Sequence, residues 1–225
     1  MENLNIIETR FATELRADQE TGQITGTAIV FNVESNLLGG QFREVIRPSA
    51  ATEEFLRSQD IVMKFNHEPN SILARYRADG QRNSLAFNTD ERGVHFRFKP
   101  KTKDQWLLED IKNGDLQACS FAFRVSPESN SEKWEKRNDG TYLRTITKFD
   151  VVRDFSIVID AAYPNTSVST RGLDELRQAE ELQKQEELKL KADQDKAAAD
   201  KKLEDQQKLE LYWKNYDDQI LALKK

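Results

Sequence analysis

The sequence predicts a mainly β domain with peripheral helices, followed by a long charged helix. Short apolar runs bounded by turn residues recur through residues 1–171 and outnumber segments with helical periodicity. This region shows no regular alternation of strands with helices and no glycine-rich phosphate loop. Beyond residue 172 the sequence contains no Gly and no Pro. A closed or nearly closed β-barrel, of the α+β class, fits the first region best.

The strands are predicted from runs rich in β-branched and aromatic residues. We expect them at residues 24–31, 45–46, 61–65, 84–88, 94–98, 116–125, 142–147 and 155–159. Residues 90–93 have the composition of a turn, which would join two of these strands. Residues 126–140 are polar and rich in turn formers, which indicates a hairpin loop or a flexible excursion.

Two short helices are predicted beside the strands. The first opens at Pro48, a residue tolerated in the first helical turn, and runs to Arg57. The second opens near Thr102, where the sequence resembles a capping box, and stops at Asn113-Gly114. Helices of this length need tertiary packing for their stability, so we expect both to lie on the periphery of the sheet structure.

Residues 172–225 have a different composition. From Asp174 onward strong helix formers dominate, and pairs such as Glu180–Lys184 have the favourable i,i+4 order. The leucines do not keep a heptad, so we expect a long solvated helix, continuous or broken, that needs a partner to bury its weak apolar stripe. Residues 209–223 are more apolar and are a candidate docking helix, with a charged tail of marginal order as the alternative.

Composition excludes several classes of function. The chain has 225 residues, 32% of them charged, and a net charge of −5, which argues against a nucleic-acid-binding protein. Its single cysteine and two histidines exclude an internal disulfide and a zinc-finger type of metal site. The N-terminal residues have neither the basic region nor the apolar run expected of a signal peptide, and no run of eighteen apolar residues occurs. We therefore expect a soluble intracellular protein without a metal or cofactor.

Two segments place a reactive side chain beside a run that reads as a buried strand. His67 lies two residues after the apolar strand at residues 61–65, where an imidazole is well placed to act as a general base. Ser120 lies between Cys119 and Phe121, and an unpaired buried hydroxyl would cost free energy. Alternation places Ser120 on the face opposite Cys119. A His and a Ser that meet in space are two parts of a nucleophilic hydrolase.

Each of these residues also has an ordinary structural explanation. His67 would otherwise be a polar loop residue, and Ser120 a serine tolerated in a packed strand. The second histidine, His95, alternates with apolar neighbours and is expected to point outward from its strand. Three carboxylates, at Asp150, Asp154 and Asp160, bracket the strand at residues 155–159, and their spacing does not show which one would orient the histidine.

Five segments in this order resemble the prohead maturation protease family of tailed bacteriophages. The segments are residues 26–32, 42–50, 65–67, 119–123 and 154–164. Each is weak alone, but their common order is specific. That family is similar to the herpesvirus assemblins, which are serine proteases built on a β-barrel of their own. The resemblance therefore implies an assemblin-like serine protease domain.

The resemblance also implies roles for individual residues. Ser120 corresponds to the nucleophile of the family and His67 to its general base. Asp154 lies where the family usually has Glu, so it would be a shortened third member, with Asp150 as the fallback. Ala161 stands where the family commonly has Pro, which affects turn geometry and not chemistry. No side chain presents itself for the oxyanion hole, so backbone N–H groups are expected there.

The function implied is that of an endopeptidase in the assembling procapsid, in the host cell cytoplasm. It would cleave scaffolding protein or the scaffolding segment of the major capsid protein, and self-cleavage is left open. We expect a homo-oligomer without nucleic-acid or membrane partners, with residues 1–171 as the protease domain and residues 172–225 as a scaffold-like or capsid-targeting tail. The alternative is a non-enzymatic scaffold protein with a vestigial protease domain.

Overall fold

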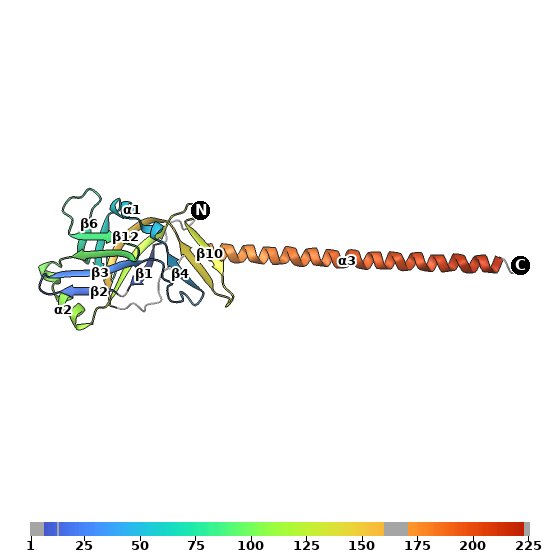
Figure 1. The fold of residues 1–225 in the computed structure, drawn as a ribbon, viewed down its shortest axis with the longest axis horizontal. Helices are drawn as coiled ribbons and strands as arrows, with labels where there is room; N and C mark the ends of the chain where they lie inside the picture. The colour runs from blue at the N-terminus through green and yellow to red at the C-terminus, as the bar shows by residue number, and fades with distance from the viewer. Residues whose placement is uncertain (1–6, 13, 160–170, 223–225) are drawn as a thin grey trace. The chain divides into compact units, whose positions relative to one another are not determined.

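The computed structural model describes residues 7–12, 14–159 and 171–222. The chain divides into two compact units, Met1–Thr170 and Arg171–Lys225. All described strands belong to the first unit, and the second consists of one helix (Figure 1). The predicted mainly β class with short helices and a C-terminal helix is confirmed.

The largest sheet has the strand order β1-β9-β12-β5-β6. Its members are β1 (Glu8–Ala12), β9 (Ala118–Val125), β12 (Phe149–Val158), β5 (Ile61–Phe65) and β6 (Ile72–Tyr76). Strand β12 lies between β9, to which it is antiparallel, and β5, to which it is parallel. This arrangement brings segments from three distant parts of the sequence side by side.

Two smaller sheets complete the first unit. The four-stranded sheet is antiparallel and contains, in spatial order, β2 (Leu15–Asp18), β3 (Gln23–Val30), β8 (Gly93–Phe98) and β7 (Leu85–Thr89). The three-stranded sheet contains β10 (Glu132–Lys136), β11 (Tyr142–Ile146) and β4 (Phe42–Ile46), with β11 parallel to β4. Residues 126–140, expected to be a loop, thus contain strand β10. Strands β1, β2 and β6 were not predicted either.

The short helices lie close to their predicted positions. A 3₁₀ turn, η1 (Pro48–Ala51), precedes α1 (Glu53–Arg57), whose first turn is capped by a hydrogen bond from the Phe55 amide to Thr52 Oγ1. Another 3₁₀ turn, η2 (Thr102–Asp104), precedes α2 (Trp106–Asn113), which ends at Gly114 in the left-handed conformation. The capping box predicted near Thr102 is wrong, because no side chain caps η2 or α2.

Aromatic side chains hold the two larger sheets together. Phe155 of β12 contacts both Phe87 of β7 and Phe96 of β8, with ring centroids 6.4 and 6.3 Å apart. All three belong to one continuous cluster of buried residues that draws on both sheets. Burial of each such ring stabilises the fold by about 1.5–3 kcal/mol. The inner faces of the sheets are therefore fixed firmly enough to position the strands that carry the site.

Among the described strands, the sheets do not close into a single barrel, so the closed barrel expected from the sequence is wrong. Strand β6 ends the large sheet, and β7 ends the four-stranded one. Where they approach, the backbone is joined only by a bond of 3.0 Å from the Ser84 amide to the Arg75 carbonyl. The intervening loop turns through left-handed Gly80 and Arg82. A polar loop that turns so sharply separates the strands before a ladder can form.

A buried ion network ties the three-stranded sheet to the large sheet. Arg10 of β1 donates two hydrogen bonds of 2.7 Å to Glu44 of β4. Arg144 of β11 donates to Glu8 of β1 at 2.6 and 2.9 Å and to Glu132 of β10 at 2.6 Å. Arg144 is only 1% exposed. Four strands from two sheets therefore share one set of paired charges.

The pairing keeps these buried groups ionised. Burial alone would raise the pKa of Glu8, but hydrogen bonds and positive charge from Arg144 and Arg10 lower it. Burial alone would likewise lower the pKa of Arg144, but the carboxylates around it raise it. Removing one member would leave an opposite charge buried without a partner, which costs far more free energy than losing an exposed ion pair.

We predict that Arg144→Met lowers the free energy of unfolding by about 3–5 kcal/mol, the cost of breaking a buried pair. The matched control is Arg75→Met, which removes an arginine paired with Asp60 at the surface and is expected to cost about 1 kcal/mol or less. Urea unfolding followed by circular dichroism measures both values. Equal losses in the two variants would contradict a structural role for the buried network.

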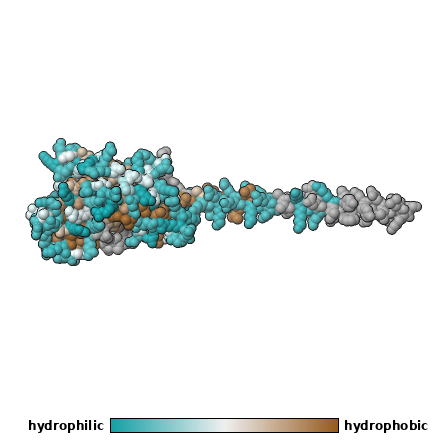
Figure 2. All heavy atoms as spheres, in the orientation of Figure 1, coloured by the Kyte–Doolittle hydropathy of each residue, from teal (hydrophilic) through white to brown (hydrophobic). Residues whose placement is uncertain are grey.

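The second unit is helix α3 (Arg171–Ala222), which is continuous for 52 residues. The break that the sequence left open is absent from the described helix. Leu182, Leu188 and Leu190 are each more than 60% exposed, and the described part of the helix surface is largely hydrophilic (Figure 2). None of the described helices is long and apolar enough to span a membrane.

Candidate active site

Three adjacent strands of the large sheet bring the predicted site residues together. Ser120 lies on β9, Asp154 lies on β12, and His67 lies two residues after the end of β5. The register of β9 and β12 sets Ser156 opposite Ser120 and Asp154 opposite Ala122. The central position of β12 thus places its carboxylate between a serine on one neighbour and a histidine on the other.

One face of this part of the sheet packs in the hydrophobic core, and the other carries the candidate site residues. One face supplies the hydrophobic core, with Cys119, Phe121, Phe123, Phe155 and Ile157. The other carries Ser120, Ala122, Asp154 and Ser156, none of which belongs to that core cluster. The predicted alternation of Ser120 with Cys119 and Phe121 is confirmed. The side chains of Ser120, Ala122 and Ser156 are small, and all three residues are buried.

A β-bulge in β12 orients Asp154. Val152 pairs with Phe123, and Asp154 pairs with Ala122, so Arg153 is the extra residue in the ladder. Strict alternation would put Val152 and Asp154 on the same face. Val152 nevertheless lies in the hydrophobic core, whereas Asp154 contacts His67. The bulge therefore turns the carboxylate toward the face that carries Ser120.

His67 is held in an uncommon backbone conformation. Asn66 and His67 have φ values of 50° and 58°, in the left-handed region that residues other than glycine rarely adopt. Asn66 is fixed to the end of β12, because its amide donates to the Ile157 carbonyl at 2.8 Å and its side chain accepts from the Ile159 amide at 3.1 Å. Strained conformations of this kind cluster at functional sites. Here the turn brings the imidazole back over β12.

The three side chains form a continuous hydrogen-bonded chain. His67 Nε2 lies 2.6 Å from Ser120 Oγ, and His67 Nδ1 lies 2.6 Å from Asp154 Oδ1. An ionised carboxylate can only accept, so Nδ1 carries the proton that faces Asp154. In the neutral ring Nε2 is then free to accept the hydroxyl proton of Ser120. This arrangement can activate a serine for attack on a carbonyl group.

Two further residues hold the carboxylate of Asp154. Ser156 Oγ donates to Asp154 Oδ1 at 3.0 Å and lies 3.1 Å from His67 Nδ1. Lys64 Nζ donates to Asp154 Oδ2 at 3.1 Å. Burial would raise the pKa of Asp154, but the hydrogen bond and charge of His67, together with Lys64, lower it. The carboxylate is therefore ionised at neutral pH although it is almost completely buried.

The sequence did not single out Lys64 and Ser156. A charged residue on an otherwise apolar strand was the available signal for Lys64. The signal for Ser156 was its place on a buried strand among bulky apolar residues. Neither signal carries information about the partner, because the contacts depend on how β5 pairs with β12.

The other candidate residues lie elsewhere or cannot be placed. Asp150 binds Arg124, whose Nε donates to it at 2.8 Å, and not His67. His95 points outward from the four-stranded sheet, as predicted, and contacts Thr27 and Asp90. Asp160 and Ala161 lie outside the described residues.

The Cys119 thiol offers no second nucleophile here, and no metal centre is evident among the residues that the structure describes. Burial raises the pKa of the Cys119 thiol, which keeps it protonated and unreactive. Within residues 7–12, 14–159 and 171–222, no group of three or more His, Cys, Asp or Glu side chains could hold a metal ion. The hydrogen-bonded chain from Asp154 through His67 ends at the hydroxyl of Ser120.

Comparison with known families agrees with this geometry. The family model described as Caudovirus prohead serine protease matches residues 8–185. The chain belongs to this family. Membership confirms the resemblance found in the sequence and implies a serine protease of capsid maturation that interacts with capsid or scaffold proteins. No curated protein and no solved structure matches the chain.

Proposed function

We propose that this chain is a prohead endopeptidase that uses Ser120 as nucleophile, His67 as general base and Asp154 as the orienting acid. The observation that supports the proposal is the hydrogen-bonded chain from the Ser120 hydroxyl through the imidazole to the buried carboxylate. These groups come from three strands and meet in the order that serine hydrolysis requires. A vestigial domain would have no need to keep His67 in a strained turn.

The reaction follows from the geometry. Ser120 Oγ attacks the scissile carbonyl carbon while His67 Nε2 takes the hydroxyl proton, and Asp154 stabilises the resulting imidazolium. The tetrahedral intermediate collapses when the imidazolium gives its proton to the leaving amine, which leaves an acyl-enzyme. Water, deprotonated by His67, then attacks the acyl group, and the regenerated serine recovers its proton. Backbone N–H groups supply the oxyanion hole.

Lys64 and Ser156 are assigned positioning roles. An aspartate is one methylene shorter than the glutamate usual in the family, so its carboxylate has to be brought close to the ring. Lys64 holds the outer oxygen, and Ser156 bridges the inner oxygen and Nδ1. Residues that hold catalytic side chains in position by hydrogen bonds are commonly needed for full activity.

The substrate proposed is scaffolding protein or the scaffolding segment of the major capsid protein. Cleavage would take place inside the procapsid, in the host cell cytoplasm, where the protease is present as a homo-oligomer, and self-cleavage is included. Residues 1–171 are assigned as the protease domain. The charged helix of residues 172–225 is assigned to capsid or scaffold binding.

Replacing the nucleophile tests the proposal. Ser120→Ala should abolish processing of co-expressed capsid and scaffolding protein, because no other hydroxyl bonds to His67 Nε2 among the described residues. The change removes one oxygen, so the free energy of unfolding should shift by only about 1 kcal/mol. Gel analysis of the co-expressed proteins measures processing. Continued processing by a folded Ser120→Ala variant would sink the protease assignment.

The assignment of the acid has its own test. Asp154→Asn should lower the cleavage rate by about 10⁴-fold, because the amide stabilises neither the correct tautomer nor the imidazolium. Asp150→Asn is the matched control, since its carboxylate binds Arg124 instead, and it should retain most activity. Initial rates on purified scaffold measure both. The opposite order of effects would make Asp150 the third member.

A shortened chain tests the role of the tail. A chain ending at Arg171 should fold and keep a reactive Ser120, because the sheets and the site lie before that residue. It should be poorly incorporated into procapsids, because the helix that binds the partner is missing. Immunoblots of purified particles measure incorporation. An insoluble or unreactive product would show that the helix belongs to the catalytic domain, and normal incorporation would remove the proposed role of the tail.

A further inference from the structure

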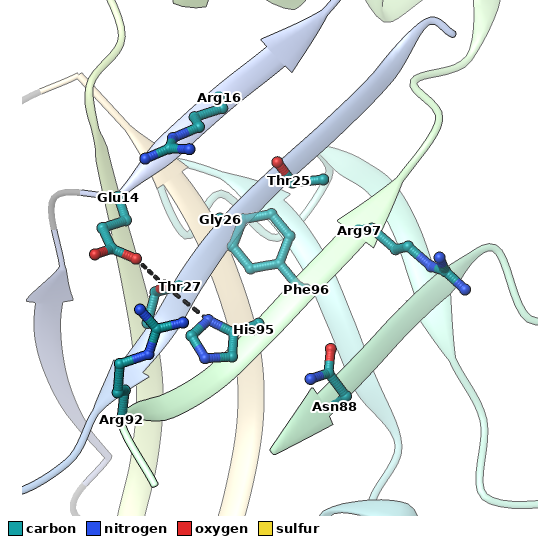
Figure 3. A pocket seen from close by; sticks show the side chains of 10 residues that line it. All are labelled: Glu14, Arg16, Thr25, Gly26, Thr27, Asn88, Arg92, His95, Phe96 and Arg97. Carbon is teal, nitrogen blue, oxygen red and sulfur yellow. Dashed lines mark hydrogen bonds between the residues drawn. The ribbon is translucent and has the colours of Figure 1, made fainter. Parts of the chain in front are cut away.

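A hollow lies on the four-stranded sheet, whose strands carry none of the proposed catalytic residues. Its volume is about 330 Å³. The lining residues are Glu14, Arg16, Thr25, Gly26, Thr27, Asn88, Arg92, His95, Phe96 and Arg97 (Figure 3). Three of them are arginines and only one is acidic. The hollow is therefore a local concentration of positive charge on a chain whose net charge is −5.

Strand register places Arg16 and Arg97 on the two strands that flank β3. Arg16 of β2 and Arg97 of β8 both pair with Thr25 of β3, from opposite sides. Neighbouring strands lie about 4.8 Å apart, so the two arginine backbones are separated by roughly 10 Å. Side chains as long as arginine can reach a common ligand across that distance. Arg92 adds a third guanidinium from the turn that precedes β8, where its Nε lies 3.6 Å from Asp90 Oδ2.

The acidic groups nearby are already bound to other partners. The Thr27 hydroxyl donates to Glu14 Oε2 at 2.6 Å and lies 3.0 Å from His95 Nδ1. His95 Nε2 lies 3.0 Å from Asp90 Oδ1. An ionised carboxylate can only accept a hydrogen bond, so the Nε2 side of the ring donates to Asp90. The hydrogen bond from His95 and those from nearby backbone amides lower the pKa of Asp90 to about 2.

Arg16 and Arg97, by contrast, have no carboxylate within ion-pair distance in the part of the chain that the structure describes. Four arginines of the same unit hold carboxylates: Arg57 with Glu53, Arg75 with Asp60, Arg124 with Asp150 and Arg137 with Glu34. Arg16 and Arg97 differ from arginines such as Arg82, which also lacks an ion pair among the described residues, because they line one hollow. Two unpaired guanidiniums that flank one hollow provide planar donors suited to carboxylates.

We propose that this hollow binds an acidic polypeptide segment, in which two or more carboxylates lie within a few residues of one another. Arg16 and Arg97 are the principal contacts, and Arg92 is a third. The volume suits one or two acidic side chains. A long nucleic acid would also be attracted to the arginines, but the net negative charge of the chain repels an extended polyanion. The site is a docking surface for a partner protein and does not depend on the chemistry of Ser120.

An NMR titration of the full chain tests the proposal. The probe is acetylated and amidated tetraglutamate, with tetraglutamine as the uncharged comparison. Tetraglutamate should shift the backbone amide signals of β2, β3 and β8 in a saturable way, and tetraglutamine should not. The double variant Arg16→Gln/Arg97→Gln should weaken binding about tenfold or more, because it removes both unpaired charges. Arg82→Gln is the control, since this arginine lies in an exposed loop and lines no part of the hollow.

Three outcomes would overturn the inference. They are the absence of shifts with tetraglutamate, equal binding by the double variant and the control, and tighter binding of a decathymidylate oligonucleotide through the same arginines. Serine-directed labelling of Ser120 is measured on the same variants and should be unchanged. If Ser120 is not labelled in the unaltered chain, the result counts against the proposed protease. The docking site is decided by the titration alone.

Discussion

The pairing of β12 with both β9 and β5 is the constraint on which the site depends. It brings a serine from one neighbour and a histidine from the other to a single carboxylate, although these residues lie far apart in the sequence. The same strand supplies Phe155 to the core on its opposite face. Catalytic geometry and core packing are therefore coupled, and a shift of β12 by one residue would exchange its two faces.

The candidate site contains backbone conformations and buried charges that lower the stability of the fold. His67 and Asn66 adopt strained backbone angles, and Asp154 and Lys64 are largely removed from solvent. Such features cost free energy unless surrounding contacts hold them. The aromatic core and the ion network of Arg10 and Arg144 provide those contacts elsewhere in the unit. The network also fixes β1, which pairs with β9 along its whole length and so supports the strand that carries Ser120.

Much of this could be predicted from the sequence. Local composition located strands β3, β5, β8, β9 and β11 to within a residue or two, and the stop of α2 at Gly114. Ser120 and His67 stood out because each is a reactive residue beside an apolar run. The strands that were missed, such as β1 with Glu8 and Arg10, carry charges that read as exposed. They are buried only because the charges pair with Glu44 and Arg144 from distant strands.

The choice between Asp150 and Asp154 lay beyond the sequence for a different reason. Both residues have the same parity on β12, so alternation assigns them to the same face. Two irregularities in the pairing with β9, the second at Arg153, change which residues point toward His67. Bulges of this kind arise from tertiary pairing and leave little local signature. Closure of the sheets was also misjudged, because it depends on the hydrogen bonds between β6 and β7 and not on the number of strands.

The most direct test of this account is covalent labelling of the native protein with diisopropyl fluorophosphate, followed by peptide mass spectrometry. The account predicts a single adduct on Ser120, and loss of that adduct when His67 is replaced by alanine in a chain that remains folded. Absence of labelling in the intact protein, or an adduct on a different serine, would contradict the assignment of Ser120 and His67 as a working pair.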